Sequence, residues 1–132
     1  MKEKFVTITG FNNYCGEQIF AIGRLVRCEK EPDNPYDAEA IRCTLPVVGK
    51  VGYIANSVAT VAVGTMSAGR VLDKVTSKFY VRVMFRTCSK VICRVEDDKE
   101  PSDLNRELYE QCADGWEDGG VDVDDVDIDI TE

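Results

Sequence analysis

The residues of this sequence best suited to chemistry lie in one short turn and are Asn34, Tyr36 and Asp37. The turn holds an amide, an aromatic ring and a carboxylate within four residues, and Pro32 and Pro35 restrict its backbone. A carboxylate can accept a hydrogen bond from a hydroxyl group while a flat base stacks on the ring. An ordinary Asx turn uses the same residue types, with Asn and Asp bonded to nearby backbone. The turn alone therefore leaves a binding site and a structural turn both open.

The sequence around the turn makes it more specific. The pattern Glu-Pro-x-Asn-Pro-Tyr-Asp-x-x-Ala-Ile occupies residues 31–41, and Val-Gly-Tyr-Ile occupies residues 51–54. Together they resemble the signature of the HIRAN domain family, with weaker support from Phe-x-x-Ile-x-Gly at residues 5–10 and from Tyr14. The resemblance extends over roughly residues 4–95. It implies a module found alone in bacteria or fused to chromatin-remodelling helicases, where it captures the 3′ end of single-stranded DNA.

The resemblance also implies a role for each residue of the turn. In DNA-binding members of the family, the residue matching Asp37 accepts a hydrogen bond from the terminal 3′ hydroxyl, and the residue matching Tyr36 stacks on a base. Asn34 matches the residue that helps to hold the turn and the DNA end. These roles are chemically reasonable, because an aromatic ring contributes about 1–3 kcal/mol per stacked base. A carboxylate would also repel a 3′ phosphate, so a free hydroxyl would be selected.

The sequence departs from the helicase-fused, DNA-end-binding member at the positions that hold phosphates there. Asn12 and Asn13 replace an Arg and a Tyr, Tyr53 replaces a His, and Asn56 replaces a Lys. Phe79 aligns with a later aromatic that flanks the bound base. Asn side chains and a helix N-terminus can still bind phosphate weakly. With fewer ion pairs, we expect weaker DNA binding and a shallower dependence of affinity on salt.

The charge of the chain is divided between a basic body and an acidic end. Residues 1–94 contain 14 Lys and Arg against 8 Asp and Glu, a net charge of +6. Residues 95–132 contain 2 against 16, a net charge of −14, so the overall −8 conceals the division. Some basic residues gather on a predicted hairpin, as a solvated strand face or as a groove that follows phosphates. They are Lys78, Arg82, Arg86, Lys90 and Arg94.

The fold class that we expect is mainly β with one or two short helices. Short β-branched runs predict strands over residues 5–9, 19–28, 40–45 and 51–54, and a hairpin over residues 77–86 and 91–95. The alternation in the hairpin places Phe79, Val81, Val83 and Phe85 on one face. Residues 56–66 are expected to form a helix, and residues 71–75 an extended segment. Many short strands favour a small barrel or a strongly bent sheet, and the resemblance implies a compact OB-like β-barrel over residues 1–95.

Residues 96–132 are expected to form an acidic tail after the barrel, with a short helix over residues 102–113. Residues 121–131 alternate β-branched residues with Asp, which fits a disordered end or a strand added to an exposed sheet edge. The tail has three open roles. It adds solubility, it masks the basic body in place of nucleic acid, or it binds an unidentified protein partner.

The sequence carries no visible catalytic arrangement, cofactor motif or metal-binding pattern. It has no histidine, and none of its six cysteines forms a Cys-x-x-Cys pair, which argues against a structural zinc site. We therefore expect no enzyme activity and no cofactor. With no apolar signal region at its start and no long apolar run, the chain is expected to be cytoplasmic, outside the membrane, with reduced and mostly buried thiols. A disulfide framework remains open by count.

Two functions from different classes follow from these observations. The first is a DNA-binding module that recognises single-stranded DNA, including its 3′ hydroxyl end, in DNA repair or at stalled replication forks. The second is a non-enzymatic interaction or regulatory module whose acidic tail binds a partner or masks the body.

Overall fold

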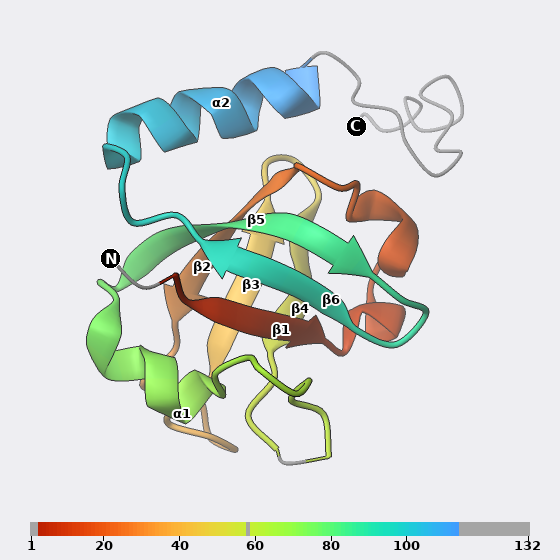
Figure 1. Ribbon diagram of the computed structural model, residues 1–132, viewed down its shortest axis with the longest axis vertical. Helices are drawn as coiled ribbons and strands as arrows, with labels where there is room; N and C mark the ends of the chain where they lie inside the picture. The colour runs from red at the N-terminus through yellow and green to blue at the C-terminus, as the bar shows by residue number, and fades with distance from the viewer. Residues whose placement is uncertain (1–2, 58, 114–132) are drawn as a thin grey trace.

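Six strands close into a barrel in the computed structural model, which describes residues 3–57 and 59–113 (Figure 1). The order around the barrel is β1-β4-β3-β2-β5-β6, and the paired strands are antiparallel. The strands are Phe5–Thr9 (β1), Leu25–Lys30 (β2), Ile41–Leu45 (β3), Gly49–Ile54 (β4), Lys78–Arg86 (β5) and Val91–Val95 (β6). The α-helices are Ala68–Val71 (α1) and Pro101–Ala113 (α2), and the 3-10 turns are Phe11–Asn13 (η1), Glu17–Ile19 (η2) and Leu72–Lys74 (η3). The expected mainly β barrel with short helices is confirmed.

Alternate residues of the strands fill the inside of the barrel. Phe79, Val81 and Val83 of β5 are buried there, together with their register partners Cys28 and Val26 of β2. Phe85, which was expected on the same face, is instead 63% exposed. The register between β5 and β6 shifts between Val83 and Phe85. A bulge of this kind turns the following side chain away from the face that alternation assigns to it.

Helix α2 covers the outer face of β2 and β5 (Figure 1). Its apolar side chains, Leu104 and Leu108, are buried as part of the main hydrophobic core. The backbone N–H of Leu25 donates to Gln111 Oε1 at 2.8 Å, and the Tyr80 hydroxyl donates to Asn105 Oδ1 at 3.1 Å. The helix expected over residues 102–113 is thus found at nearly the same place, and it extends the folded part of the chain past residue 95.

The segment between β4 and β5 differs from expectation. Residues 56–66 were expected to be helical, but the described part of this segment forms turns, and the helix α1 begins later, at Ala68. The extended segment expected over residues 71–75 is the end of α1 and the turn η3. The physical reason is that carbonyl groups of β1 hold both ends of the segment. The N–H groups of Ala55 and Met66 donate to Thr7 O and Phe5 O, both at 2.7 Å. Both ends of the segment are thus held on β1, and the described residues between them form turns.

The second expected strand is also shorter than the sequence suggested. Residues 19–28 were expected to be continuous, but Ile19 ends η2 and the strand β2 starts at Leu25. Gly23 lies in the intervening turn with φ of 90°, a left-handed conformation that favours glycine. The glycine therefore ends a turn before the strand and does not interrupt the strand itself.

The β-prone or disordered end expected over residues 121–131 lies outside the described residues. Within the described residues, the closed strand order gives each strand two neighbours. No described helix is long and apolar enough to cross a membrane.

The six cysteines are all free. Cys28, Cys43 and Cys93 are buried, whereas Cys15 and Cys88 are exposed, so fewer thiols are buried than expected.

We predict that Leu108→Ala will lower the free energy of unfolding by about 2–5 kcal/mol, because it leaves a cavity between α2 and the barrel. The measurement is urea unfolding of the full chain. The neighbouring Tyr109→Ala, at a side chain that is 49% exposed, is the control and should change the value by about 0.5 kcal/mol or less. Equal and small effects of the two changes would show that α2 does not pack on the barrel.

Candidate nucleic-acid interface

A shallow pocket of about 420 Å³ lies beside the turn between β2 and β3. Its walls also come from the end of β1, the end of β4 and the loop that follows β4. It is lined by Thr9, Asn34, Tyr36, Asp37, Ala40, Tyr53, Ile54, Ala55, Asn56, Ser57 and Thr60. Five of the eight residues expected to bind a DNA end therefore line one pocket: Asn34, Tyr36, Asp37, Tyr53 and Asn56.

The other three expected residues lie elsewhere. Asn12 and Asn13 are exposed in the turn η1 and do not line this pocket. Phe79 is buried inside the barrel and borders a separate hollow near the start of α2. The structure thus does not bring these three residues together with the turn at residues 34–37.

The turn itself is built by the side chain of Asn34. Its Oδ1 accepts hydrogen bonds from the backbone N–H groups of Tyr36, at 2.8 Å, and Asp37, at 3.1 Å. Its Nδ2 donates to Glu31 Oε1 at 2.9 Å. This is an Asx turn, and it holds the backbone of Tyr36 while 95% of that residue stays exposed. The ring is therefore a platform with an open face.

The carboxylate of Asp37 is fixed through both of its oxygens. Oδ1 accepts from the backbone N–H of Glu39 at 2.9 Å, and Oδ2 accepts from Asn56 Nδ2 at 3.3 Å. Each oxygen of a carboxylate has two lone pairs, so each retains one for a ligand. Asp37 can therefore accept a hydrogen bond from a hydroxyl group in the pocket without giving up its internal partners.

Glu31 joins the turn to the opposite wall of the pocket, and sequence reasoning did not assign it a role. Its Oε1 accepts from Asn34 Nδ2 and from the Tyr53 hydroxyl, at 3.0 Å, while Arg42 Nη1 donates to Oε2 at 3.3 Å. Lys50 Nζ donates in turn to the Tyr53 hydroxyl at 2.9 Å. The hydroxyl of Tyr53 is thus used within the protein. The signal available in the sequence was the position of Glu31 at the start of the signature at residues 31–41.

These contacts lower the pKa of Glu31. Burial of the carboxyl group acts in the opposite direction and raises the pKa, but it is outweighed. The hydrogen bonds from Asn34 and Tyr53 and the positive charges of Lys50 and Arg42 favour the ionised form. Glu31 is therefore held as a carboxylate.

Gly52 lets β1 approach the pocket closely. A Cβ atom at this position would lie 2.9 Å from Ile8 Cγ2 and 3.0 Å from the carbonyl oxygen of Thr9. The register pairs Thr9 with Tyr53, which brings the end of β1 to the pocket wall. In the Val-Gly-Tyr-Ile pattern, Gly52 therefore permits the close contact with β1, and Tyr53 lines the pocket.

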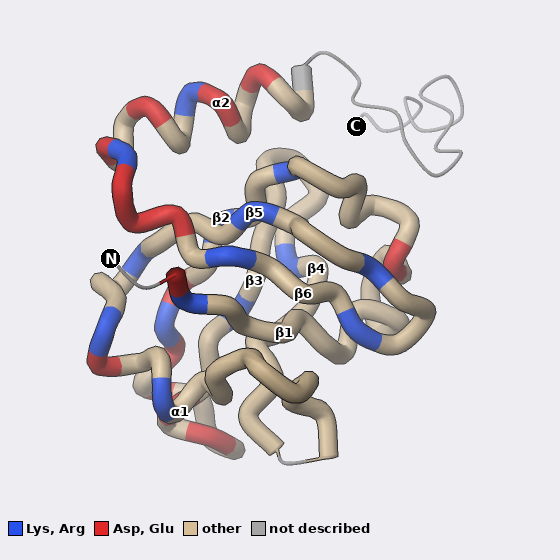
Figure 2. The backbone as a smooth tube through the Cα atoms, in the orientation of Figure 1, with Lys and Arg blue, Asp and Glu red and all other residues tan. Residues whose placement is uncertain are grey.

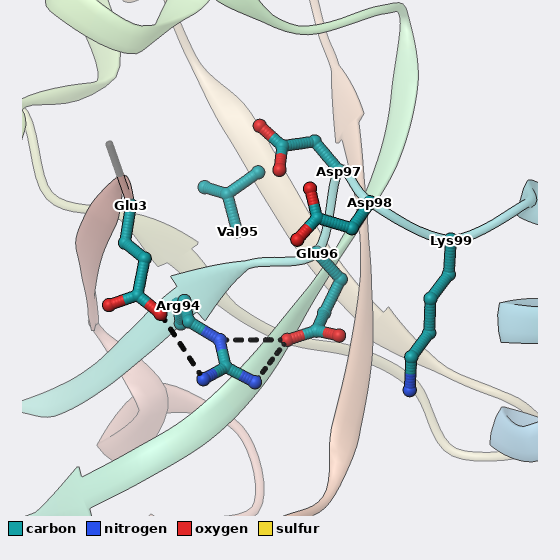
Figure 3. Close-up of a pocket in the computed structure, with 7 residues that line it drawn as sticks. All are labelled: Glu3, Arg94, Val95, Glu96, Asp97, Asp98 and Lys99. Atoms are coloured by element: carbon teal, nitrogen blue, oxygen red, sulfur yellow. Dashed lines mark hydrogen bonds and ion pairs between the residues drawn. The ribbon is translucent and has the colours of Figure 1, made fainter. Parts of the chain in front are cut away.

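The expected basic hairpin is largely neutralised by carboxylates. Arg82 makes two hydrogen bonds to Glu107 of α2, at 2.8 and 3.1 Å, which lower the pKa of that carboxyl group. Arg94 lies between Glu3 and Glu96, with distances of 3.6 and 2.8 Å (Figure 3). Acidic residues 96–98 follow β6 directly, beside the basic positions on the strands (Figure 2). The hollow in Figure 3, of about 210 Å³, has four carboxylates in its lining, which would repel a phosphate.

The remaining hairpin cations also lie near protein acceptors or outside the pocket. Lys78 Nζ is 4.0 Å from Glu29 Oε2. Arg86 Nη1 donates to the carbonyl oxygens of Glu17 and Phe20, at 3.5 and 3.4 Å. Lys90 precedes β6 in the hairpin turn. Of the two interpretations of the hairpin, these contacts favour a paired strand face over a groove that follows phosphates.

Comparison with known proteins identifies the family. The family model of the HIRAN domain matches residues 1–98. The chain belongs to the HIRAN domain family. No curated protein matches it. Among solved structures, the crystal structure of the HIRAN domain of human HLTF is similar, with a TM-score of 0.50 and 18% sequence identity over 89% of this chain and 92% of that one. At this identity the similarity shows the shared fold. The family-model match includes every residue of the pocket and ends before α2 begins at Pro101.

We predict that the stability of this HIRAN domain depends on pH through Glu31, and that Glu31→Gln removes this dependence. Because the folded-state pKa lies below the reference value of 4.5, the stabilisation is fully present above that pH. It is lost as the pH falls through the lowered pKa. The free energies of unfolding of the wild type and of the variant should therefore differ near neutral pH and converge in acid. Urea unfolding from about pH 7 to about pH 3 measures this, and a constant difference over that range would contradict it.

The matched control is Glu110→Gln, at an exposed position on α2. Its free energy of unfolding should differ from that of the wild type by the same small amount at every pH.

Proposed function

We propose that this HIRAN domain binds single-stranded DNA and reads a free 3′ hydroxyl at the pocket beside Tyr36 and Asp37. The observation that carries the proposal is the placement of an exposed aromatic ring next to a carboxylate held through both oxygens, in one pocket. Membership of the HIRAN family adds support, because the family is in general a DNA-binding one. The role is binding, without a chemical step.

The proposed division of labour follows from the two side chains. The terminal base stacks on the Tyr36 ring, a contact that tolerates any base because each has a π-face. The 3′ hydroxyl donates to an oxygen of Asp37. A 3′ phosphate would meet this carboxylate. Glu39, which accepts from the same Asn56 amide at 3.0 Å, adds a second negative charge beside it. Like charges at about 4 Å repel by roughly 1–4 kcal/mol near a protein surface, so the phosphate-ended strand binds less tightly.

Few cations are available for the phosphates of the bound strand. Lys50 does not line the pocket, and its ammonium group donates to the Tyr53 hydroxyl and lies 5.0 Å from the centre of that ring. Arg42 is paired with both Glu29 and Glu31. A binding mode with one or two phosphate contacts should show a salt slope of about −0.7 per contact. The setting that we propose is the handling of free 3′ ends in DNA repair or at stalled replication forks.

We predict that Tyr36→Ala will weaken binding of a short single strand about 5- to 150-fold, whichever group ends the strand, because it removes the stacking platform. Fluorescence anisotropy with the full chain measures the affinity. Tyr36→Phe keeps the ring and should bind like the wild type. Tyr109→Ala, an exposed tyrosine on α2, is the matched control. Equal binding by the wild type and Tyr36→Ala would contradict the proposed stacking.

We also predict that Asp37→Asn will reduce the preference for a 3′ hydroxyl over a 3′ phosphate. The amide is close in size to the carboxylate and removes the charge that repels phosphate. The same strand is compared with each ending, in wild type and variant. A wild type that binds both endings equally, or a variant that keeps the full preference, would contradict the role of Asp37.

A further inference from the structure

Asn56 connects the carboxylate of Asp37 to the start of α1. Its Nδ2 donates to Asp37 Oδ2 at 3.3 Å and to Glu39 Oε1 at 3.0 Å. Its Oδ1 accepts from the backbone N–H of Gly69 at 2.8 Å. The three partners come from two segments that flank β3 and β4 in the chain, so the bonds span 13 to 19 residues of sequence.

The orientation of the Asn56 amide is fixed by the chemistry of its partners. The backbone N–H of Gly69 requires an acceptor, and the two carboxylates require donors. A flipped amide would set its oxygen against two carboxylates and its NH₂ group against an N–H, which would be repulsive on both sides. The NH₂ group has two hydrogens, and both are used, one on each carboxylate. No donor of this side chain is left for a phosphate of the bound strand.

We infer that Asn56 is a positioning residue that orients the Asp37 carboxylate toward a 3′ hydroxyl, and that it does not itself bind phosphate. The inference rests on the proposed function and assigns Asn56 a role different from the phosphate contact expected at this position. Without the shared amide, the Asp37 and Glu39 carboxylates repel each other, and Asp37 swings toward solvent. The amide bonds both carboxylates at once and so holds Asp37, which lines the pocket, next to Glu39.

Gly69 supports the same arrangement from the helix side. A Cβ atom at Gly69 would lie 2.6 Å from Glu39 Oε1, so a side chain at this position would displace the glutamate. The helix α1 begins one residue earlier, after Ser67, whose Oγ accepts from Arg70 N at 3.3 Å. The capped first turn therefore presents the Gly69 N–H to Asn56 Oδ1 from a defined place.

The test compares the full-length wild type with Asn56→Leu, which is close in size but forms none of the three hydrogen bonds. Each protein is titrated with one short single strand that ends in a 3′ hydroxyl or in a 3′ phosphate. We expect the ratio of the two affinities to fall about tenfold in the variant, while the salt slope stays unchanged. A loss of affinity that is equal for both endings, with a shallower salt slope, would identify Asn56 as a phosphate contact and overturn the inference.

A second variant and a control complete the design. Asn56→Ala makes no steric demand and should give the same fall in the ratio, so a folding defect of the leucine variant does not decide the result. Gln18→Leu removes an exposed amide side chain in η2, outside the pocket, and should leave the ratio unchanged.

A measurement without DNA separates failure of this inference from failure of the proposed function. Amide hydrogen exchange of Gly69 reports directly on its bond to Asn56. We expect its protection to fall in both Asn56 variants and to stay unchanged in Gln18→Leu. Unchanged protection would overturn the inference whatever the DNA result. A wild type that prefers neither ending contradicts the proposed function, and it removes Asn56's role toward the hydroxyl even where the bond to Gly69 is intact.

Discussion

The pocket depends on one partly buried carboxylate, that of Glu31. It accepts hydrogen bonds from Asn34, which builds the turn, and from Tyr53, which forms the opposite wall. The cations of Arg42 and Lys50 lie beside it and keep it ionised. A charge-assisted bond from each side fixes the distance between two segments that are far apart in the chain. The exposed ring of Tyr36 can serve as a platform only because the backbone beneath it is held in this way.

The closed barrel holds this turn in place. The charged side chains of its hairpin form ion pairs within the protein more than they face a ligand. Arg82 and Arg94 were candidates for binding phosphate, yet each is engaged by carboxylates, including Glu107 of α2. These pairs bridge the hairpin to α2 and to the segment after β6. Some of the cations in the basic body that the sequence indicates are therefore used in ion pairs within the fold. The proposed binding mode therefore relies on stacking and on a hydrogen bond from a neutral hydroxyl, since Lys50 and Arg42 already have partners within the protein.

The short-range parts of the fold could be predicted from the sequence, since alternation and turn residues act locally. The hairpin, the Asx turn and the helix at Pro101–Ala113 are of this kind. Phe85 could not be placed, because its side depends on a bulge set by the neighbouring strand. The segment at 56–66 could not either, since its two ends are held by carbonyl groups of β1, which is distant in the sequence.

The candidate site was likewise predicted in part: its residues could be identified from the sequence, but their contacts could not. The family signature brought Asn34, Tyr36 and Asp37 into view, and the structure groups them with Tyr53 and Asn56. It did not indicate what each polar atom bonds to. Asn56 was expected to face phosphate, whereas its partners are residues 13 to 19 positions away, including a backbone N–H of a helix that was not anticipated. Such partners become visible only when the chain is folded.

The central claim is that the DNA end is read at the turn and not on the hairpin. A titration of the ¹⁵N-labelled full chain with a short 3′-hydroxyl strand tests it most directly, followed by amide chemical shifts. We expect the largest changes at Asn34, Tyr36, Asp37 and residues 53–57, which line the pocket, with little change in β5 and β6. Changes concentrated on β5 and β6, or spread evenly over the barrel, would contradict the account.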